Sequence, residues 1–157
     1  MKIVFLTVGK TEDAYLKDGI DKYVKRLKHY TRLEILELAE LKNTKALTPE
    51  QQKVKEAEMI LKKVSALDHV VLLDENGSEF SSKQFANYLD KKAIASTSTL
   101  IFIVGGPYGF DQTVYTRAND QLSLSRMTFS HQMIRLLFTE QLYRAFTIIK
   151  GEPYHHE

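Results

Sequence analysis

LIFIVGGPYGF, residues 100–110, joins a run of apolar residues to a turn that holds three glycines and a proline. The apolar run ends at Val104 and has the β-branched and aromatic content typical of a buried strand. The glycines would let backbone amides approach a ligand closely, and the proline stiffens the turn. Ligands of open α/β sheets bind beyond the carboxyl ends of strands, so this turn is a candidate binding site. Its Gly-Gly-x-x-Gly spacing matches neither the P-loop nor the dinucleotide-binding motif, and an ordinary tight turn is the alternative.

Strands and helices are predicted to alternate on both sides of this turn. Periodicity predicts strands over 3–8, 33–38, 69–74, 99–104 and 122–125. It predicts helices over 13–29, 49–65, from Ser81 or Ser82 to about 93, 111–118 and 130–150. A turn signal, Glu75-Asn76-Gly77, follows the third strand. This order predicts a single α/β domain with a mainly parallel sheet and helices on both faces.

Composition limits the classes of function. No run reaches about 18 consecutive apolar residues, so we expect no membrane-spanning helix. The absence of cysteine excludes disulfides and thiolate metal sites and fits a cytoplasmic protein. The net charge of +2 does not by itself indicate nucleic-acid binding. A basic cluster is either a solvated helix face or a phosphate-binding surface: Lys22, Lys25, Arg26, Lys28 and Arg32.

The predicted helix over 130–150 carries apolar residues around almost its whole circumference. A helix of this kind must be buried on all sides. In so short a chain, we favour burial against a second copy over a central helix, with two-fold symmetry. The sequence therefore predicts a homodimer built on this helix, with Leu137 and Phe146 in the interface.

Four separated segments carry a family resemblance: GGPYG at 105–109, LSLSRMTFSHQ at 122–132, EQLYRAF at 140–146 and GEPYHHE at 151–157. Together with the length and the start of the chain, they resemble the ribosomal RNA large subunit methyltransferase H family of the SPOUT class. The resemblance covers essentially the full chain. It implies a C-terminal trefoil knot, which general rules of chain topology would not predict, and a homodimer with cofactor sites near the interface. It also implies methylation of N3 of a pseudouridine in the helix 69 hairpin of large-subunit rRNA, on the assembled ribosome.

The resemblance places S-adenosylmethionine against Leu73, at the end of the third strand, and Gly105 in the turn. The remaining contacts come from the knot loop: Leu124, Ser125, Arg126, Met127, Thr128 and Phe129. A sulfonium methyl is already activated, so no metal is expected, but the weakly acidic imide must lose its proton. Four residues are candidates for orienting the substrate or handling that proton: His131, Arg144, Tyr154 and His155.

Each of these candidates also has a purely structural interpretation. His131 could bond its neighbours at the helix start, Arg144 could pair with Glu140 four residues earlier, and the tail could be frayed. The sequence also departs from the family, with Ser130 in place of a common proline and His156 in place of a basic residue.

Two other classes of protein remain possible on pattern alone. A flavodoxin-like nucleotide-binding module would explain the sheet but not the apolar helix. A non-catalytic ribosome-binding protein would explain the basic cluster but not the glycine turn.

Overall fold

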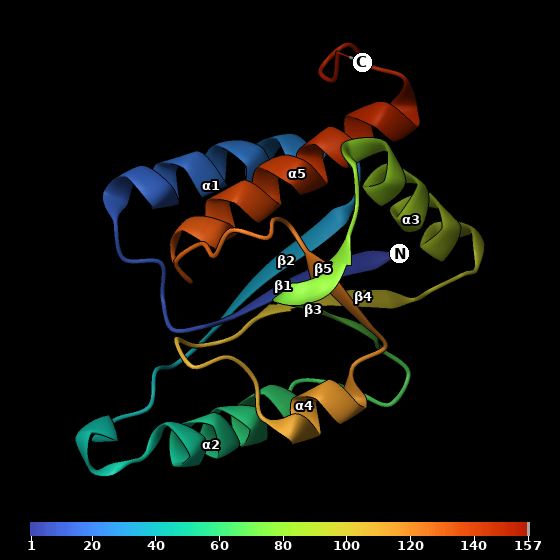
Figure 1. The fold of residues 1–157 in the computed structure, drawn as a ribbon. Coiled ribbons are helices and arrows are strands. Elements are labelled where there is room, and N and C mark those ends of the chain that lie inside the picture. The colour runs from blue at the N-terminus through green and yellow to red at the C-terminus, as the bar shows by residue number, and fades with distance from the viewer. Residues whose placement is uncertain (157) are drawn as a thin grey trace.

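A parallel five-stranded sheet lies at the centre of the computed structural model, which describes residues 1–156 (Figure 1). Its strands are β1 (Lys2–Val8), β2 (Arg32–Leu38), β3 (His69–Glu79), β4 (Thr99–Val104) and β5 (Asp120–Ser123). They lie in the order β2-β1-β4-β3-β5, and every neighbouring pair is parallel. The predicted α/β architecture with a parallel sheet is confirmed.

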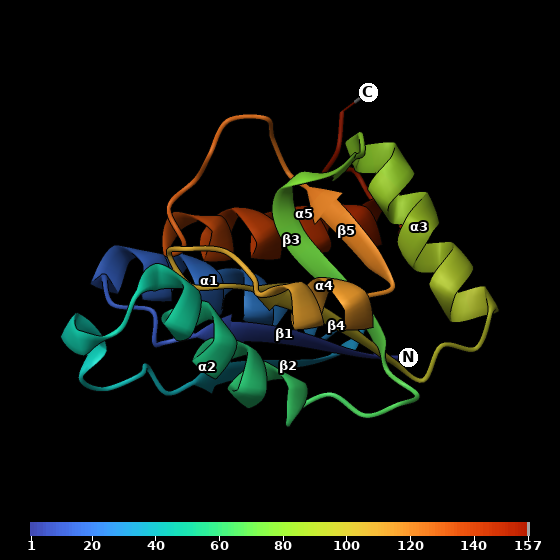
Figure 2. The same ribbon diagram turned by 60° about the horizontal axis from the view of Figure 1, so that its bottom comes forward.

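Helices cover both faces of the sheet. They are α1 (Ala14–Leu27), α2 (Pro49–Leu61), α3 (Ser82–Ile94), α4 (Gln112–Arg117) and α5 (Met133–Lys150), with a short 3-10 helix, η1, at Thr44–Ala46. Helices α1, α3 and α5 pack on one face, and α2 and α4 lie on the other (Figures 1 and 2). Each face has its own apolar core, because the strand residues alternate between the two sides. No helix in the described part of the chain is long and apolar enough to cross a membrane.

Strand β3 differs most from its predicted form. It does not end before a turn at residues 75–77 but continues to Glu79, with a bulge against β5 between Leu73 and Ser78. Gly77 is needed for close strand approach: a Cβ atom there would lie 2.7 Å from the backbone of Gln121. A glycine in a strand can mark such an approach as well as a turn, and sequence alone does not separate the two.

Helix α5 begins later than predicted, at Met133, after a turn in which the Ser130 hydroxyl accepts a hydrogen bond from the Met133 amide at 3.0 Å. Much of its apolar circumference is covered inside one chain. Phe138 packs against Phe5 and Phe102 of the sheet, with ring centroids 4.7 and 4.8 Å apart. Phe146 is also buried in this core, so a single chain accounts for most of its burial, and its place in a dimer interface stays a prediction. Leu137 is half-buried and is not part of that core.

Candidate functional site

A cavity of about 520 Å³ opens at the carboxyl end of β4, beside the bulge in β3. Three separate segments line it: residues 73–76 of β3, the turn over 104–110, and the loop over 124–131. Tyr115 of α4 and Ile134 of α5 complete the wall. The volume lies within the range of roughly 300–1,000 Å³ that is typical of small-molecule sites. The turn that the sequence singled out thus lies at the cavity.

The glycines of this turn serve different purposes. A Cβ atom at Gly106 would lie 2.6 Å from the Oε1 atom of Glu56, so the turn rests directly on that carboxylate. A Cβ atom at Gly105 would meet the ring of Phe110 at 3.0 Å. Gly109 has a φ of 81°, which favours glycine on backbone grounds, and its amide donates to the Gly106 carbonyl at 3.2 Å. Gly105 and Gly106 therefore allow Phe110 and Glu56 to pack closely against the backbone of the turn.

Most of the predicted cofactor residues line this cavity. They are Leu73, Gly105, Leu124, Ser125, Met127, Thr128 and Phe129. Arg126 does not: its side chain is 89% exposed, and its Nε atom pairs with Glu79 at 3.0 Å. The loop is shaped locally, since the Ser125 hydroxyl accepts a hydrogen bond from the Met127 amide at 3.0 Å.

The cavity wall is acidic. Asp74 accepts a hydrogen bond from the Tyr115 hydroxyl, and Glu75 accepts one from the Thr128 hydroxyl. Burial, followed by the bond to Asp74, raises the pKa of Tyr115, so this phenol stays a donor at neutral pH. Among the described residues that line the cavity there is no lysine or arginine, and His131 is the group that can become a cation. Such a wall favours a ligand with positive charge over a phosphate.

Sequence reasoning missed Asp74, Glu75 and Tyr115 as lining residues. The first two were assigned to the end of a strand and a turn. Their signal was available, because polar residues directly after a buried apolar run mark the carboxyl end of a strand.

A buried carboxylate lies beneath the glycine turn. Glu56 of α2 is 4% exposed, and its Oε2 atom accepts a hydrogen bond from Gln52 at 3.1 Å. Burial raises the pKa of Glu56, opposed by the bond from Gln52, by the Gly106 amide and by the charge of His131. Within residues 1–156, no lysine or arginine forms an ion pair with Glu56.

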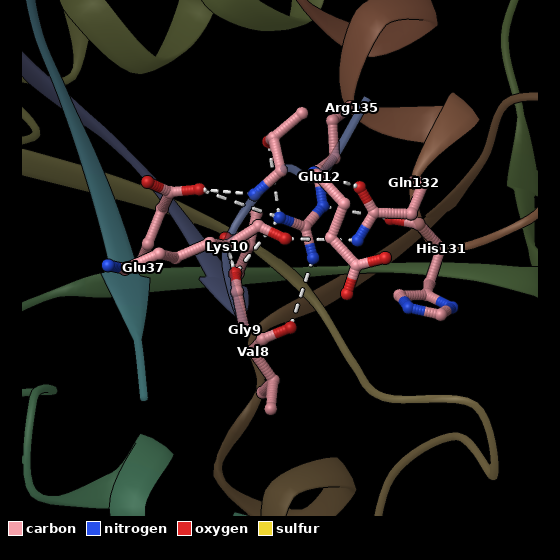
Figure 3. A network of polar contacts seen from close by, with 10 residues as sticks. Val8, Gly9, Lys10, Glu12, Glu37, His131, Gln132 and Arg135 are labelled. Carbon is pink, nitrogen blue, oxygen red and sulfur yellow. Dashed lines mark hydrogen bonds and ion pairs between the residues drawn. The ribbon is translucent and has the colours of Figure 1, made fainter. Parts of the chain in front are cut away.

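A buried arginine fixes the backbone at His131 (Figure 3). The guanidinium of Arg135, 1% exposed, donates to the carbonyls of Val8 and Gly9 at 3.0 and 2.9 Å. Its Nε atom donates to the His131 carbonyl at 2.9 Å. Arg135 therefore joins the end of β1 to the entry of α5, and with it holds one wall of the cavity. Sequence reasoning missed it, although an arginine in a largely apolar helix is itself a signal of a specific role.

Gln132 adds to this connection. Its Nε2 atom donates to the Lys10 carbonyl at 3.1 Å, and its Oε1 atom accepts from the Glu12 amide at 2.9 Å (Figure 3). The entry of α5 is thus held by two adjacent side-chain networks.

The other three candidate residues form a separate cluster at the far end of α5. Arg144 donates to Glu140 at 2.7 Å and to the Nδ1 atom of His155 at 3.1 Å. The Tyr154 hydroxyl donates to Glu140 at 2.9 Å, and the Arg144 guanidinium lies over the Tyr154 ring at 4.8 Å. We call these four residues the tail cluster. None of them lines the cavity, and at about 1.5 Å per helical residue Arg144 lies roughly 16 Å along α5 from Met133.

Within one chain, α5 therefore separates these three candidates from His131. The described residues also hold no group of three or more His, Asp or Glu side chains that could bind a metal ion.

Comparisons with known proteins agree on one family. The family described as "Predicted SPOUT methyltransferase" matches residues 1–155. Two relatives are each named "Ribosomal RNA large subunit methyltransferase H". The first, from Parabacteroides distasonis, is 52% identical over 157 residues, and the alignment covers 100% of both chains. That of Christiangramia forsetii is 54% identical over 156 residues and covers 99% of both. The crystal structure of a tRNA (m1G37) methyltransferase from Aquifex aeolicus shares the fold, with a TM-score of 0.56 at 14% identity, covering 100% of this chain and 76% of that one.

Proposed function

The chain belongs to the ribosomal RNA large subunit methyltransferase H family of SPOUT methyltransferases, and from this membership we propose that it methylates large-subunit ribosomal RNA with S-adenosylmethionine as donor. The acceptor we propose is N3 of a pseudouridine in helix 69, presented by the assembled ribosome. Such a substrate places the enzyme in the cytoplasm.

The observation that best supports the donor is the charge of the cavity wall. S-adenosylmethionine carries a sulfonium and an ammonium group, and Asp74 and Glu75 offer carboxylates to a cation. The apolar lining from Leu73, Leu124 and Phe129 suits an adenine ring. A phosphate of a nucleotide would instead meet two carboxylates and, among the described lining residues, no lysine or arginine. The residues present therefore fit the methyl donor and speak against a flavodoxin-like site.

The donor, when bound, supplies a methyl group on a positively charged sulfur, which is already a good electrophile. What the chain must add is orientation and removal of the imide proton. His131, in the cavity wall, is the residue we assign to that proton, with its neutral imidazole as acceptor. Arg135 is a positioning residue, since it bonds the His131 carbonyl rather than the cavity.

The tail cluster enters the proposal only through a second subunit. Arg144 is on α5, Tyr154 and His155 are in the tail after it, and all three are distant from the cavity of their own chain. They can therefore act on substrate when a partner subunit brings its cavity to them. We propose a two-fold homodimer in which the tail cluster of one subunit completes the cavity of the other. The half-buried Leu137 lies on the helix between the two places and is the residue we expect in the interface.

RNA binding is assigned to the exposed basic residues of α1. Lys22 and Lys25 of α1 and Lys28 just after it are exposed and can meet phosphates. Arg26 is half-buried, with its guanidinium 5.4 Å from the ring centroid of Tyr143, so part of its role is to pack α1 on α5.

Calorimetry with three ligands tests the donor assignment. We expect S-adenosylmethionine to bind at one site per chain and ATP and flavin mononucleotide to show no binding, because their phosphates meet the acidic wall. Binding of either nucleotide in preference to S-adenosylmethionine would overturn the proposal in favour of a nucleotide-binding module.

A further inference from the structure

Glu56 is a negative charge built into the floor of the cavity, under a turn that itself lines it. The carboxylate is too buried to contact a ligand, at 4% exposure. Its closeness to the turn is fixed by Gly106, where a Cβ atom would lie 2.6 and 2.8 Å from the two carboxylate oxygens. One layer of backbone therefore separates this charge from the cavity.

Three groups around Glu56 favour its ionised form and oppose the effect of burial on its pKa. Gln52 of the same helix donates to it at 3.1 Å, and the Gly106 amide faces it from the turn. Glu40, which follows β2, adds a second negative charge, and His131 is the facing group that can carry a positive one. Within residues 1–156 no lysine or arginine forms an ion pair with Glu56 itself, so part of the field of this carboxylate reaches the cavity.

We propose that Glu56 makes the cavity discriminate by charge, favouring the cationic methyl donor over its neutral thioether product. This proposal rests on the proposed function, and it assigns a role to a residue that does not touch the ligand. Transfer of the methyl group returns the electrons of the broken C–S bond to sulfur, so the sulfonium charge disappears at that step. Donor and product otherwise carry the same groups, and an uncompensated carboxylate nearby holds the donor more tightly and lets the product leave.

Glu56→Gln tests this role, because it removes the charge while nearly preserving the shape. The measurement is the ratio of the dissociation constants of S-adenosylhomocysteine and S-adenosylmethionine, each obtained by calorimetry. We expect this ratio to fall by about tenfold in Glu56→Gln, the order expected for one charge acting across a protein interior at about 10 Å. Glu58→Gln is the matched control, since Glu58 carries the same charge on the same helix but is exposed; its ratio should stay at the wild-type value.

A pH series on the unaltered protein gives an independent measurement. Burial raises the pKa of Glu56 above its ordinary value of 4.5, so the carboxylate is lost at a higher pH than usual. The wild-type ratio should therefore fall as pH is lowered toward this raised pKa, and the fall should be smaller in Glu56→Gln. Titration of the ligands and of the other cavity groups is common to the wild type and Glu56→Gln, so the difference between the two pH series reports the charge of Glu56.

Two results would overturn the inference. If both ligands weaken by the same factor in Glu56→Gln, the residue merely supports the turn. If Glu58→Gln lowers the ratio as much, the effect belongs to the charge of the whole protein. Failure of the wild type to bind S-adenosylmethionine at all is a different result, which would overturn the proposed function itself.

Discussion

Single residues of the glycine turn are constrained by the protein atoms packed against them as much as by the cavity that they line. Gly105 and Gly106 look interchangeable in the sequence, yet one faces the ring of Phe110 and the other a buried carboxylate. Sequence reasoning placed the ligand against Gly105, and the structure does place this glycine in the cavity wall. Phe110 belongs to the same turn, but Glu56 comes from α2, and its place under Gly106 could not be inferred from the motif.

Gly106→Ala should destabilise the protein by about 1–3 kcal/mol, because the added methyl overlaps the Glu56 carboxylate and forces it or the turn to move. Thermal unfolding measures this loss. Gly105→Ala should cost less, since its nearest contact is a ring atom at 3.0 Å rather than a carboxylate oxygen at 2.6 Å. Adding Glu56→Ala to Gly106→Ala should restore part of the lost stability; if the double variant is less stable than Gly106→Ala, the overlap is not the cause.

The two arginines of α5 should behave differently when replaced. Arg135→Met removes hydrogen bonds to Val8, Gly9 and His131 from a side chain that is 1% exposed, and should cost about 3 kcal/mol or more. Arg144→Met removes a pair with Glu140, whose two side chains are 24% and 18% exposed, and a hydrogen bond to His155, and should cost about 1 kcal/mol. Chemical denaturation of both variants is the measurement. Equal losses would show that Arg135 does not anchor the entry of α5.

Elements were easier to predict than their ends. All five strands and all five α-helices follow from apolar periodicity, because each buries one face or stripe against the sheet. The ends were less certain: β3 runs through a turn signal, and α5 starts three residues after its predicted start. Both errors lie beside the cavity, where close approach to β5 and the turn at Ser130 override local propensity.

The pairing of β3 with β5 is supported at its other end by a polar cluster. Asp120 of β5 accepts a hydrogen bond from Tyr88 at 2.6 Å, lies 2.7 Å from the Nε2 atom of His69, and pairs with Lys92 at 3.7 Å. Burial opposes ionisation, but the bonds from Tyr88 and His69 and the charge of Lys92 together lower the pKa of Asp120. This cluster lies away from the cavity, so we assign it to the stability of the sheet edge.

Stability should therefore depend on pH through Asp120. A carboxylate whose pKa is lower in the folded state stabilises the fold above its unfolded pKa, and this contribution is lost as pH falls through the folded value. Asp120→Asn should lower the melting temperature by a few degrees at pH 7, and the difference from wild type should shrink below the ordinary value of 3.8. A difference that is as large at low pH as at pH 7 would show that the charge of Asp120 is not what stabilises the edge.

At the scale of the whole molecule, periodicity predicted the layers but not how the candidate residues are distributed. The trefoil knot came only from the family resemblance, whereas the dimer was predicted both from the apolar helix and from the resemblance, and both remain predictions. The apolar helix that suggested a dimer is largely buried in its own chain. The stronger reason for a dimer is that the cavity and the tail cluster lie at opposite ends of α5.

Mixing two defective variants tests whether subunits share sites. His131→Ala impairs the cavity, and Arg144→Ala impairs the tail cluster, so each alone should have little activity. Co-expressed in equal amounts, they should recover about a quarter of wild-type activity, because half of the dimers are mixed and one site in each is intact. If activity in the mixture stays at the sum of the two variants, the tail cluster does not serve a second subunit.

Methyl transfer to ribosomes tests the central claim most directly. Purified enzyme would be incubated with S-adenosylmethionine labelled in its methyl group and with ribosomes that either contain or lack the helix 69 pseudouridines. We expect label in the large-subunit RNA of the first ribosomes and none in the second. Enzyme that binds the donor yet labels neither ribosome, or labels both equally, would contradict the assignment of this chain as a pseudouridine methyltransferase.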